Sequence, residues 1–205
     1  MASSAYLSSA SSYKNRSIMV KRARPVLYAH HHTFARMAAM TASATPRPAR
    51  YWLMKSEPEE CSIDDALAAP NATVPWTGVR NYQARNFMRD DMQVDDGVLF
   101  YHSSCPEPGI AGLARVASGT RTDPTQFDPA SPYYDPKSPA DKPRWLLLDV
   151  QAQRKTRLLP LAELRQHPLL TALRVLQPGN RLSITPVEPA HWEDILRLLQ
   201  APPGA

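Results

Sequence analysis

The sequence lacks the features of several common protein classes. It has only two cysteines, Cys61 and Cys105, and they do not form the C-x-x-C spacing of a zinc or redox site. No apolar run approaches the roughly 18 residues that span a membrane. A G-x-S-x-G nucleophile elbow, a phosphate-binding P-loop and a cluster of metal ligands are also missing. The sequence therefore predicts two reduced thiols, no membrane partner, no metal and no cofactor.

Acidic residues are absent from the first fifty positions. That segment holds eight of the 24 Lys and Arg residues, so residues 51–205 carry 16 basic residues against all 19 acidic ones, a formal net charge of −3. The overall charge of +5 is thus a property of the N-terminal segment. If residues 51–205 bind nucleic acid, they need a local basic patch or a specific pocket rather than bulk positive charge.

Residues 1–49 are predicted to be a disordered tail before one domain at residues 50–200. The tail is rich in Ser, Ala and Arg and has no sustained hydrophobic period, so it has little to bury. Three interpretations stay open: an organelle transit peptide, a flexible nucleic-acid-binding arm, or upstream sequence before a true start at Met37 or Met40. We expect a cytoplasmic, or nucleoid-associated, location in a bacterium and a nuclear or mitochondrial one in a eukaryote.

Short strands and short helices are interspersed along residues 50–200. Strands are predicted at 51–54, 98–104, 109–119, 144–154 and 179–188, helices at 62–69, 81–92 and 189–199, and one or two short helices within 159–173. Ser62 and Asp65 have the spacing of a capping box at the start of the first helix. The Pro-rich stretch at 122–145 is predicted to be a long loop. The lack of regular βαβ spacing favours an α+β fold with a small barrel over a doubly wound sheet.

Residues 76–90, "WTGVRNYQARNFMRD", combine an indole and a phenol ring with three Arg and three side-chain amides. At a helical period, Ala84, Phe87 and Met88 fall on one side, while Tyr82 and Arg89 fall opposite. The first side is predicted to anchor the helix in the core. The second side is free for recognition.

Several motifs together resemble the EVE domain family. They are "YWLMKSEP", "W.GVRNYQARNFMR", "GVLFYHS", "PGIAGLARV" and "DPTQFDP…YYDPKS" followed by "RW.LLDV", and they extend over residues 50–199. The resemblance implies a PUA-like fold, which is a small β-barrel with short helices around it. It also implies binding of a modified base in DNA or RNA, with no catalytic activity. Cys61, Ser104 and Cys105 depart from the family pattern at the edge of the expected pocket, which leaves the identity of the base open.

A base that is flipped out of a nucleic acid needs flat walls and a hydrogen-bonding edge. Trp76, Tyr82 and either Phe100 or Tyr101 are candidates for the walls. Ser56, Asn81, Gln83, Asn86 and Ser103 are candidates for reading the base edge, because hydroxyls and amides both donate and accept. Further candidates around the pocket are Lys55, Glu57, Gly78, Val79, His102 and Tyr134. Phosphates are predicted to lie on Arg80, Arg85 and Arg89, and Lys55 is placed to help. We expect the protein to be a monomer that binds a methylated or hydroxymethylated cytosine in DNA or RNA.

Structural roles compete with several of these assignments. Trp76 is equally compatible with a core position, Glu57 with a backbone cap, and Arg89 with a solvated ion pair to Asp90. Either Tyr133 or Tyr134 is expected to hold down its own loop while the other helps to close the pocket. A hydrolase of modified nucleosides that uses Lys55, Glu57 and His102, as in ASCH-type relatives, is the alternative function. A third hypothesis is a protein-interaction module built on the Pro- and Tyr-rich loop.

Overall fold

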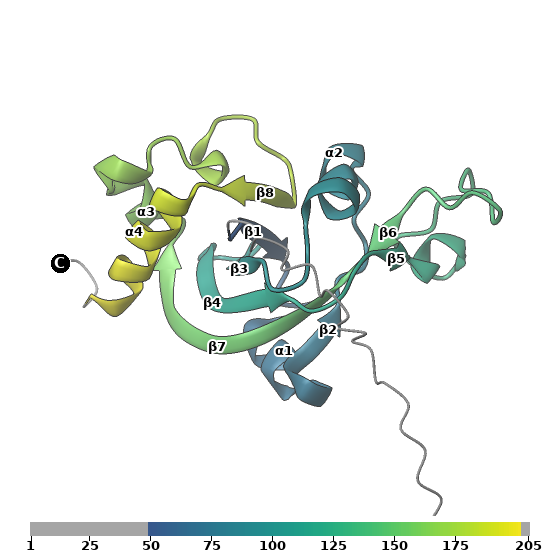
Figure 1. The fold of residues 1–205 in the computed structure, drawn as a ribbon, viewed down its shortest axis with the longest axis horizontal. Helices are drawn as coiled ribbons and strands as arrows, with labels where there is room; N and C mark the ends of the chain where they lie inside the picture. Colours follow the sequence, from purple (N-terminus) through teal and green to yellow (C-terminus); the bar gives the residue numbers. More distant parts are fainter. Residues whose placement is uncertain (1–48, 202–205) are drawn as a thin grey trace, which may run out of the picture. The chain divides into compact units, whose positions relative to one another are not determined.

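The computed structural model describes residues 49–201, and the expected tail at 1–49 lies almost wholly outside them. The main sheet contains six strands: β1 (Tyr51–Ser56), β2 (Thr73–Pro75), β3 (Gly97–His102), β4 (Gly109–Val116), β7 (Asp149–Pro160) and β8 (Ile184–Val187). Their order is β2-β7-β4-β3-β1-β8, in which β1 and β3 run parallel and the other neighbours antiparallel. The long strand β7 bends around β4, so the sheet is strongly curled (Figure 1). The predicted α+β class, with short helices around the sheet, is confirmed.

The helices are short, as the interspersed pattern predicts. They are α1 (Ile63–Ala68), α2 (Tyr82–Asn86), α3 (Leu161–Gln166) and α4 (Pro189–Gln200), with single 3₁₀ turns at Pro70–Ala72, Pro124–Phe127, Pro168–Leu170 and Arg174–Leu176. The predicted capping box at the start of α1 is confirmed, because Ser62 and Asp65 bond to each other's backbone N–H. Helix α2 continues into a π-helical turn, Phe87–Asp91. None of the helices within residues 49–201 has the length and apolar composition needed to cross a membrane.

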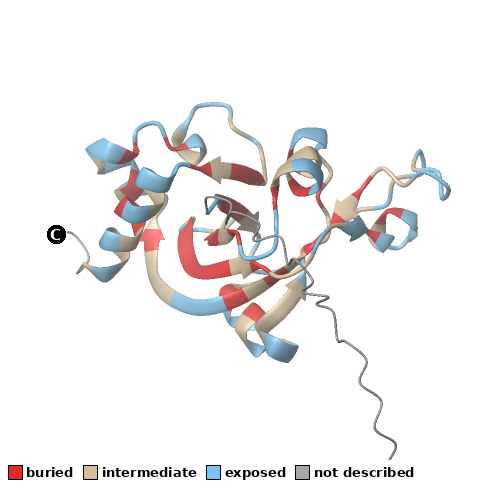
Figure 2. Ribbon diagram, in the orientation of Figure 1, coloured by how far each residue is buried: buried red, intermediate tan, exposed pale blue. Residues whose placement is uncertain are grey.

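The side chains of β3 alternate between two hydrophobic clusters on opposite faces of the sheet. Val98 and Phe100 lie in a cluster with Trp52, and Leu99 and Tyr101 lie in the other cluster. This alternation follows from strand geometry, since successive residues of a strand point to opposite faces. Buried residues accordingly follow β1, β3 and β4, while the middle of β7 is exposed (Figure 2).

One predicted strand is wrong. The stretch at 144–154 divides at Leu148 into β6 (Leu146–Leu147), which pairs with β5 (Arg121–Thr122), and the first part of β7 in the main sheet. The carbonyl of Leu148, at the break, accepts the backbone N–H of Trp76 at 2.8 Å. The apolar run hid this break because both halves contain buried apolar residues, such as Leu147 and Val150. The break at Leu148 brings two segments to the same point: the Pro-rich loop, which lies between β5 and β6, and the segment after β2.

Candidate functional site

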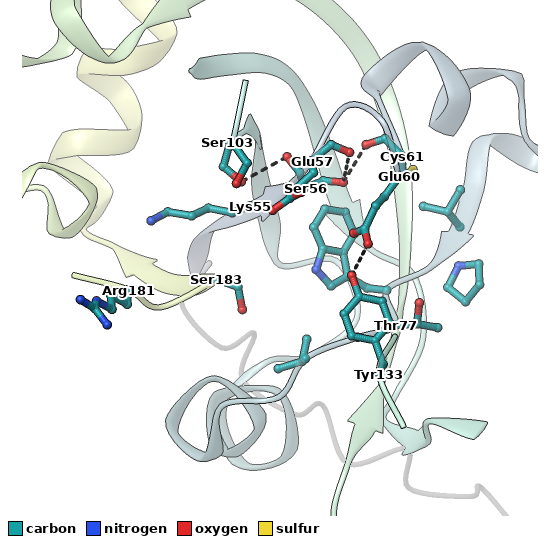
Figure 3. Close-up of a pocket in the computed structure, with 16 residues that line it drawn as sticks. Lys55, Ser56, Glu57, Glu60, Cys61, Thr77, Ser103, Tyr133, Arg181 and Ser183 are labelled. Atoms are coloured by element: carbon teal, nitrogen blue, oxygen red, sulfur yellow. Dashed lines mark hydrogen bonds between the residues drawn. The ribbon is translucent and has the colours of Figure 1, made fainter. Parts of the chain in front are cut away.

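A cavity of about 570 Å³ opens where β1 ends (Figure 3). Its walls come from the end of β1 and the turn after it, from β2 and the following turn, from the residues after β3, from those before β8, and from Tyr133 in the Pro-rich loop. Figure 3 shows Lys55 and Arg181 approaching from one side, with Glu60 and Tyr133 facing them from the other. Segments that are far apart in the sequence therefore meet at one hollow.

Parallel pairing of β1 with β3 explains why two of these segments meet. Ser56 is in register with His102, and the N–H of Ser103 donates to the carbonyl of Ser56 at 2.9 Å. Parallel strands end at the same edge of a sheet, so the polar residues that follow them are brought together. The pairing carries Lys55 and Ser103 to the cavity.

Trp76 forms an aromatic wall. It follows β2 directly and is 7% exposed, and its ring meets Phe100 edge to face with centroids 5.2 Å apart. Phe100 is fully buried, so it supports Trp76 from behind instead of facing the cavity. The indole N–H of Trp76 has no hydrogen-bond partner within residues 49–201. Trp76 is therefore both a core residue and a wall of the cavity, and its indole N–H is a donor without a partner in residues 49–201.

Tyr133 forms a second aromatic wall. Its hydroxyl donates to the carboxylate of Glu60, and burial together with this hydrogen bond raises the pKa of Tyr133 to about 12. The ring packs flat against Gly78, and a Cβ on Gly78 would lie 2.6–2.9 Å from three ring carbons. The guanidinium carbon of Arg80 lies 5.5 Å from the ring centroid, a cation–π contact. Three contacts thus fix the position of this wall.

Asp123 holds the turn at Gly78 to the loop that carries Tyr133. This carboxylate is fully buried and accepts hydrogen bonds from Arg80 (2.8 Å), the N–H of Gly78 (3.0 Å) and both the N–H and the hydroxyl of Thr125. Burial alone would raise the pKa of Asp123, but the hydrogen bonds outweigh it and hold the pKa below its usual value. The ion pair between Arg80 and Asp123 is therefore part of the scaffold behind the cavity.

Replacing Gly78 with Ala is expected to lower the free energy of unfolding by about 1–3 kcal/mol relative to wild type. Gly78 has φ +77°, where a side chain is strained, and its methyl group would also press on Tyr133. Gly179→Ala is the matched control, because Gly179 has φ +75° with no atom within 4 Å of a new Cβ. Urea titrations should show a larger loss for Gly78→Ala; equal losses would mean that packing against Tyr133 contributes nothing.

Several polar groups at the cavity have no partner within the described part of the chain. Among them are the ammonium of Lys55, the carboxylate of Glu57, and the hydroxyls of Thr77 and Ser183. Burial lowers the pKa of Lys55 from its ordinary value, because a charged ammonium loses water there. With the indole N–H of Trp76, the cavity presents several donors and one strong acceptor.

Seven of the residues expected around the base line the cavity. They are Lys55, Ser56, Glu57, Trp76, Gly78, Val79 and Ser103. The hydroxyl of Ser56 donates to the carbonyl of Cys61 at 2.7 Å, so Ser56 holds the turn after β1 in place.

The structure does not bring the β3 candidates to the cavity. Phe100 lies behind Trp76, and Tyr101 is buried in the cluster on the other face of the sheet. His102 accepts the N–H of Ile63 through Nε2 at 3.1 Å, which makes it part of the start of α1. The alternative catalytic set of Lys55, Glu57 and His102 is thus not assembled. The aromatic side chains of β3 pack into the two hydrophobic clusters on opposite faces of the sheet, so neither of them lines the cavity.

The candidates on α2 also lie elsewhere. Asn81 is the N-cap of the helix, and its Oδ1 accepts the N–H groups of Gln83 and Ala84. Tyr82 is half exposed and packs on Trp145, with ring centroids 4.9 Å apart. The side-chain oxygen of Asn86 accepts from Arg85. The amide oxygen of Asn81, predicted to read a base edge, therefore caps α2 instead.

The three arginines predicted to hold phosphate have protein partners. Arg80 is paired with Asp123, and exposed Arg89 with Asp90 at 2.7 Å. Arg85 donates to Asn86 and to the carbonyl of Arg144. None of the three lines the cavity. Neighbouring carboxylates and carbonyls, which a linear pattern does not reveal, hold these cations.

Nine lining residues were not among the candidate site residues, although Cys61 and Ser104 were expected at the edge of the pocket. They are Glu60, Cys61, Val74, Pro75, Thr77, Ser104, Tyr133, Arg181 and Ser183. The prediction selected Tyr134, which is 42% exposed and does not line the cavity, over its neighbour Tyr133. The "YY" pair predicted one tyrosine at the pocket but not which one. Arg181 and Ser183 had no local signal, because only the pairing of β8 with β1 carries them to the site.

Acid is expected to weaken the fold through His102. Burial lowers the pKa of His102 below its ordinary 6.5; Asp64 and Asp65 oppose the shift, and Lys155 adds to it. Between the folded-state pKa of His102 and pH 6.5, the unfolded chain binds more protons than the folded chain. The stability that the neutral imidazole contributes is therefore complete above pH 6.5 and is lost as the pH falls below it. Urea titrations from pH 7.5 to 5 should show this loss in wild type and a smaller one in His102→Gln. An identical pH dependence in the two proteins would contradict the role of the neutral imidazole.

Comparison with known proteins shows where the chain belongs. The family model described as "EVE domain" matches residues 50–198. Within the described residues, no group of three His, Cys, Asp or Glu is arranged to hold a metal. Thymocyte nuclear protein 1 of Danio rerio is 44% identical over 164 residues, covering 72% of this chain and 71% of the relative. The Homo sapiens protein of that name is 42% identical over 173 residues, covering 75% and 76%.

Two solved structures match in fold as well as in sequence. A Pseudomonas putida protein is 48% identical with a TM-score of 0.69, covering 73% of this chain and 99% of that one. Human THYN1 in complex with 5-methylcytosine containing DNA is 42% identical with a TM-score of 0.72, covering 76% of this chain and all of that one. By its sequence and by its fold, the chain belongs to the EVE domain family.

Proposed function

We propose that this protein binds DNA that carries 5-methylcytosine, or another cytosine modified at C5, and takes the flipped base into the cavity beside Trp76. The observation that carries the proposal is that Trp76 and Tyr133 line one cavity together with polar groups that have no partner within residues 49–201. The volume of about 570 Å³ lies within the usual range of small-ligand sites, roughly 300–1,000 Å³. A base needs such a combination of flat walls and polar edge.

The polar groups match the edge of cytosine. Cytosine offers an amino donor and two acceptors, N3 and O2, so it needs one acceptor and two donors from the protein. The Glu57 carboxylate is the acceptor for the amino group. Trp76 Nε1–H and the hydroxyls of Thr77 and Ser183 are the available donors. A carbon substituent at C5 would lie against an aromatic or apolar wall, where burial favours the modified base.

The human relative supports the choice of polymer and base. Its structure is described as a complex with DNA that contains 5-methylcytosine, and it covers 76% of this chain at 42% identity. The charge balance agrees with a pocket-based mechanism. Residues 51–205 carry a net charge of −3, so sequence-independent attraction to phosphates is weak and selectivity depends on the pocket.

Titration of the full chain with fluorescent oligonucleotides tests the proposal. Matched DNA duplexes carry one 5-methylcytosine, 5-hydroxymethylcytosine, N6-methyladenine or no modification. We expect about tenfold tighter binding to 5-methylcytosine than to cytosine, equivalent to about 1.4 kcal/mol. Equal affinity for all four duplexes would refute base recognition. Tighter binding to an RNA of the same sequence with 5-methylcytosine would reassign the polymer to RNA.

A further inference from the structure

A second depression, of about 540 Å³, shares Arg181 with the cavity already described. One side of it is formed by Asn81 and Gln83 at the start of α2. The other side is formed by residues 172–182, which include Arg174. No acidic residue of the described part of the chain lines it. The two hollows therefore lie on either side of one arginine.

The cations at these hollows differ from most others of the described chain. Nine ion pairs hold other Lys and Arg side chains, among them those of Arg80, Arg89 and Arg157 with their carboxylates. Lys55, Arg174 and Arg181 have no carboxylate partner within residues 49–201. In a domain with an excess of acidic residues, cations without partners that gather at adjoining hollows indicate an anionic ligand.

The segment that carries the two arginines is held by its own side chains. The amide of Asn180 donates to the carbonyl of Arg174 at 2.7 Å and accepts the N–H of Leu182 at 3.1 Å, and the amide of Gln177 donates to the carbonyl of Thr171 at 2.6 Å. The backbone needs neither guanidinium to keep its form. Arg174 and Arg181 are exposed, and their donors remain available.

We propose that the DNA strand carrying the flipped nucleotide continues from the first cavity past Arg181 into the second depression. Arg181 binds the phosphate between the flipped nucleotide and its neighbour, and Arg174 binds the next phosphate. The side-chain amide of Gln83, which has no partner in the described residues, faces that neighbouring nucleotide. This proposal rests on the proposed function, because it follows the strand outward from the flipped base. It moves the phosphate contacts from α2, where the sequence predicts them, to residues 174–181.

The salt dependence of DNA binding tests this path. We would compare Arg174→Gln and Arg181→Gln in the full chain with Arg154→Gln, an exposed residue that lines neither hollow and has no partner in residues 49–201. Each phosphate contact that is lost lowers the slope of log K against log[salt] by about 1. We expect that decrease for Arg174→Gln and Arg181→Gln, with several-fold weaker binding to modified and unmodified duplexes alike, and no change for Arg154→Gln.

The outcomes separate this proposal from the function on which it rests. Slopes for Arg174→Gln and Arg181→Gln that equal that of Arg154→Gln, in a protein that still prefers 5-methylcytosine, would overturn the path alone. Reduced slopes in a protein without any base preference would support the path and refute base recognition. Arg174→Gln is the cleaner variant, since Arg174 lines only the second depression.

Discussion

Replacing Asp123 with Asn is expected to lower the free energy of unfolding by about 3 kcal/mol, as the loss of one partner of a buried ion pair does. The substitution keeps the shape of the side chain and removes the charge. It turns one acceptor oxygen into a donor in a place where every neighbour donates: Arg80, Gly78 and Thr125. The guanidinium of Arg80 is left partly buried without its carboxylate.

Asp149→Asn is the matched control for this prediction. Asp149 also pairs with an arginine, Arg121, at 2.7 and 2.8 Å, but that guanidinium is 48% exposed. Surface ion pairs contribute about 0–1 kcal/mol. Urea titrations of the three proteins at pH 7 measure the difference. A loss for Asp123→Asn no larger than that for Asp149→Asn would show that Asp123 does not organise the turn and the loop.

Replacing Tyr133 with Ala is expected to weaken binding to a 5-methylcytosine duplex by about 10- to 100-fold. Loss of a base-stacking aromatic costs on the order of 1–3 kcal/mol. The ring lines the cavity opposite Lys55 and Arg181, and no other tyrosine of residues 49–201 lines it (Figure 3). Titration with modified and unmodified duplexes measures both the affinity and the preference, and we expect both to fall.

The adjacent residue provides the control. Tyr134→Ala removes the same ring from a position that is 42% exposed and outside the cavity, so its affinity should match wild type. Tyr133→Phe keeps the wall and removes only the hydrogen bond to Glu60, so it should retain most of the binding. Equal losses for Tyr133→Ala and Tyr134→Ala would contradict the wall, and unfolding curves check that each variant is folded.

Local sequence signals predicted the parts of the fold that local forces decide. The capping box at Ser62 and the strand at β3 both appear as expected, because each depends on neighbours one to four residues away. The break at Leu148 was missed because it depends on a distant partner, Trp76. A buried apolar run has the same pattern whether it serves one sheet or two.

The residues of the candidate site fall into the same two groups, those that local signals predict and those that distant contacts place. Residues at the end of a strand or directly after it, such as Lys55, Ser56 and Trp76, reach the cavity because the strand ends there. The arginines of α2 do not, because long side chains find carboxylates and carbonyls that are far away in sequence, as Arg80 finds Asp123. Arg181 reaches the cavity only through the pairing of β8 with β1. A single sequence contains no sign of such a pairing.

The indole N–H resonance of Trp76 tests the central claim most directly. The chain has four tryptophans; Trp52 and Trp145 donate their N–H to Asp96 and Asp135, whereas the N–H of Trp76 is unpartnered within residues 49–201. Spectra of ¹⁵N-labelled protein, assigned with Trp76→Phe, would be recorded with and without duplex DNA. We predict a large shift of the Trp76 resonance with a 5-methylcytosine duplex, a much smaller shift with the unmodified duplex, and little change at Trp52. A Trp76 resonance that does not move when the protein is saturated with modified DNA would contradict binding of the base in this cavity.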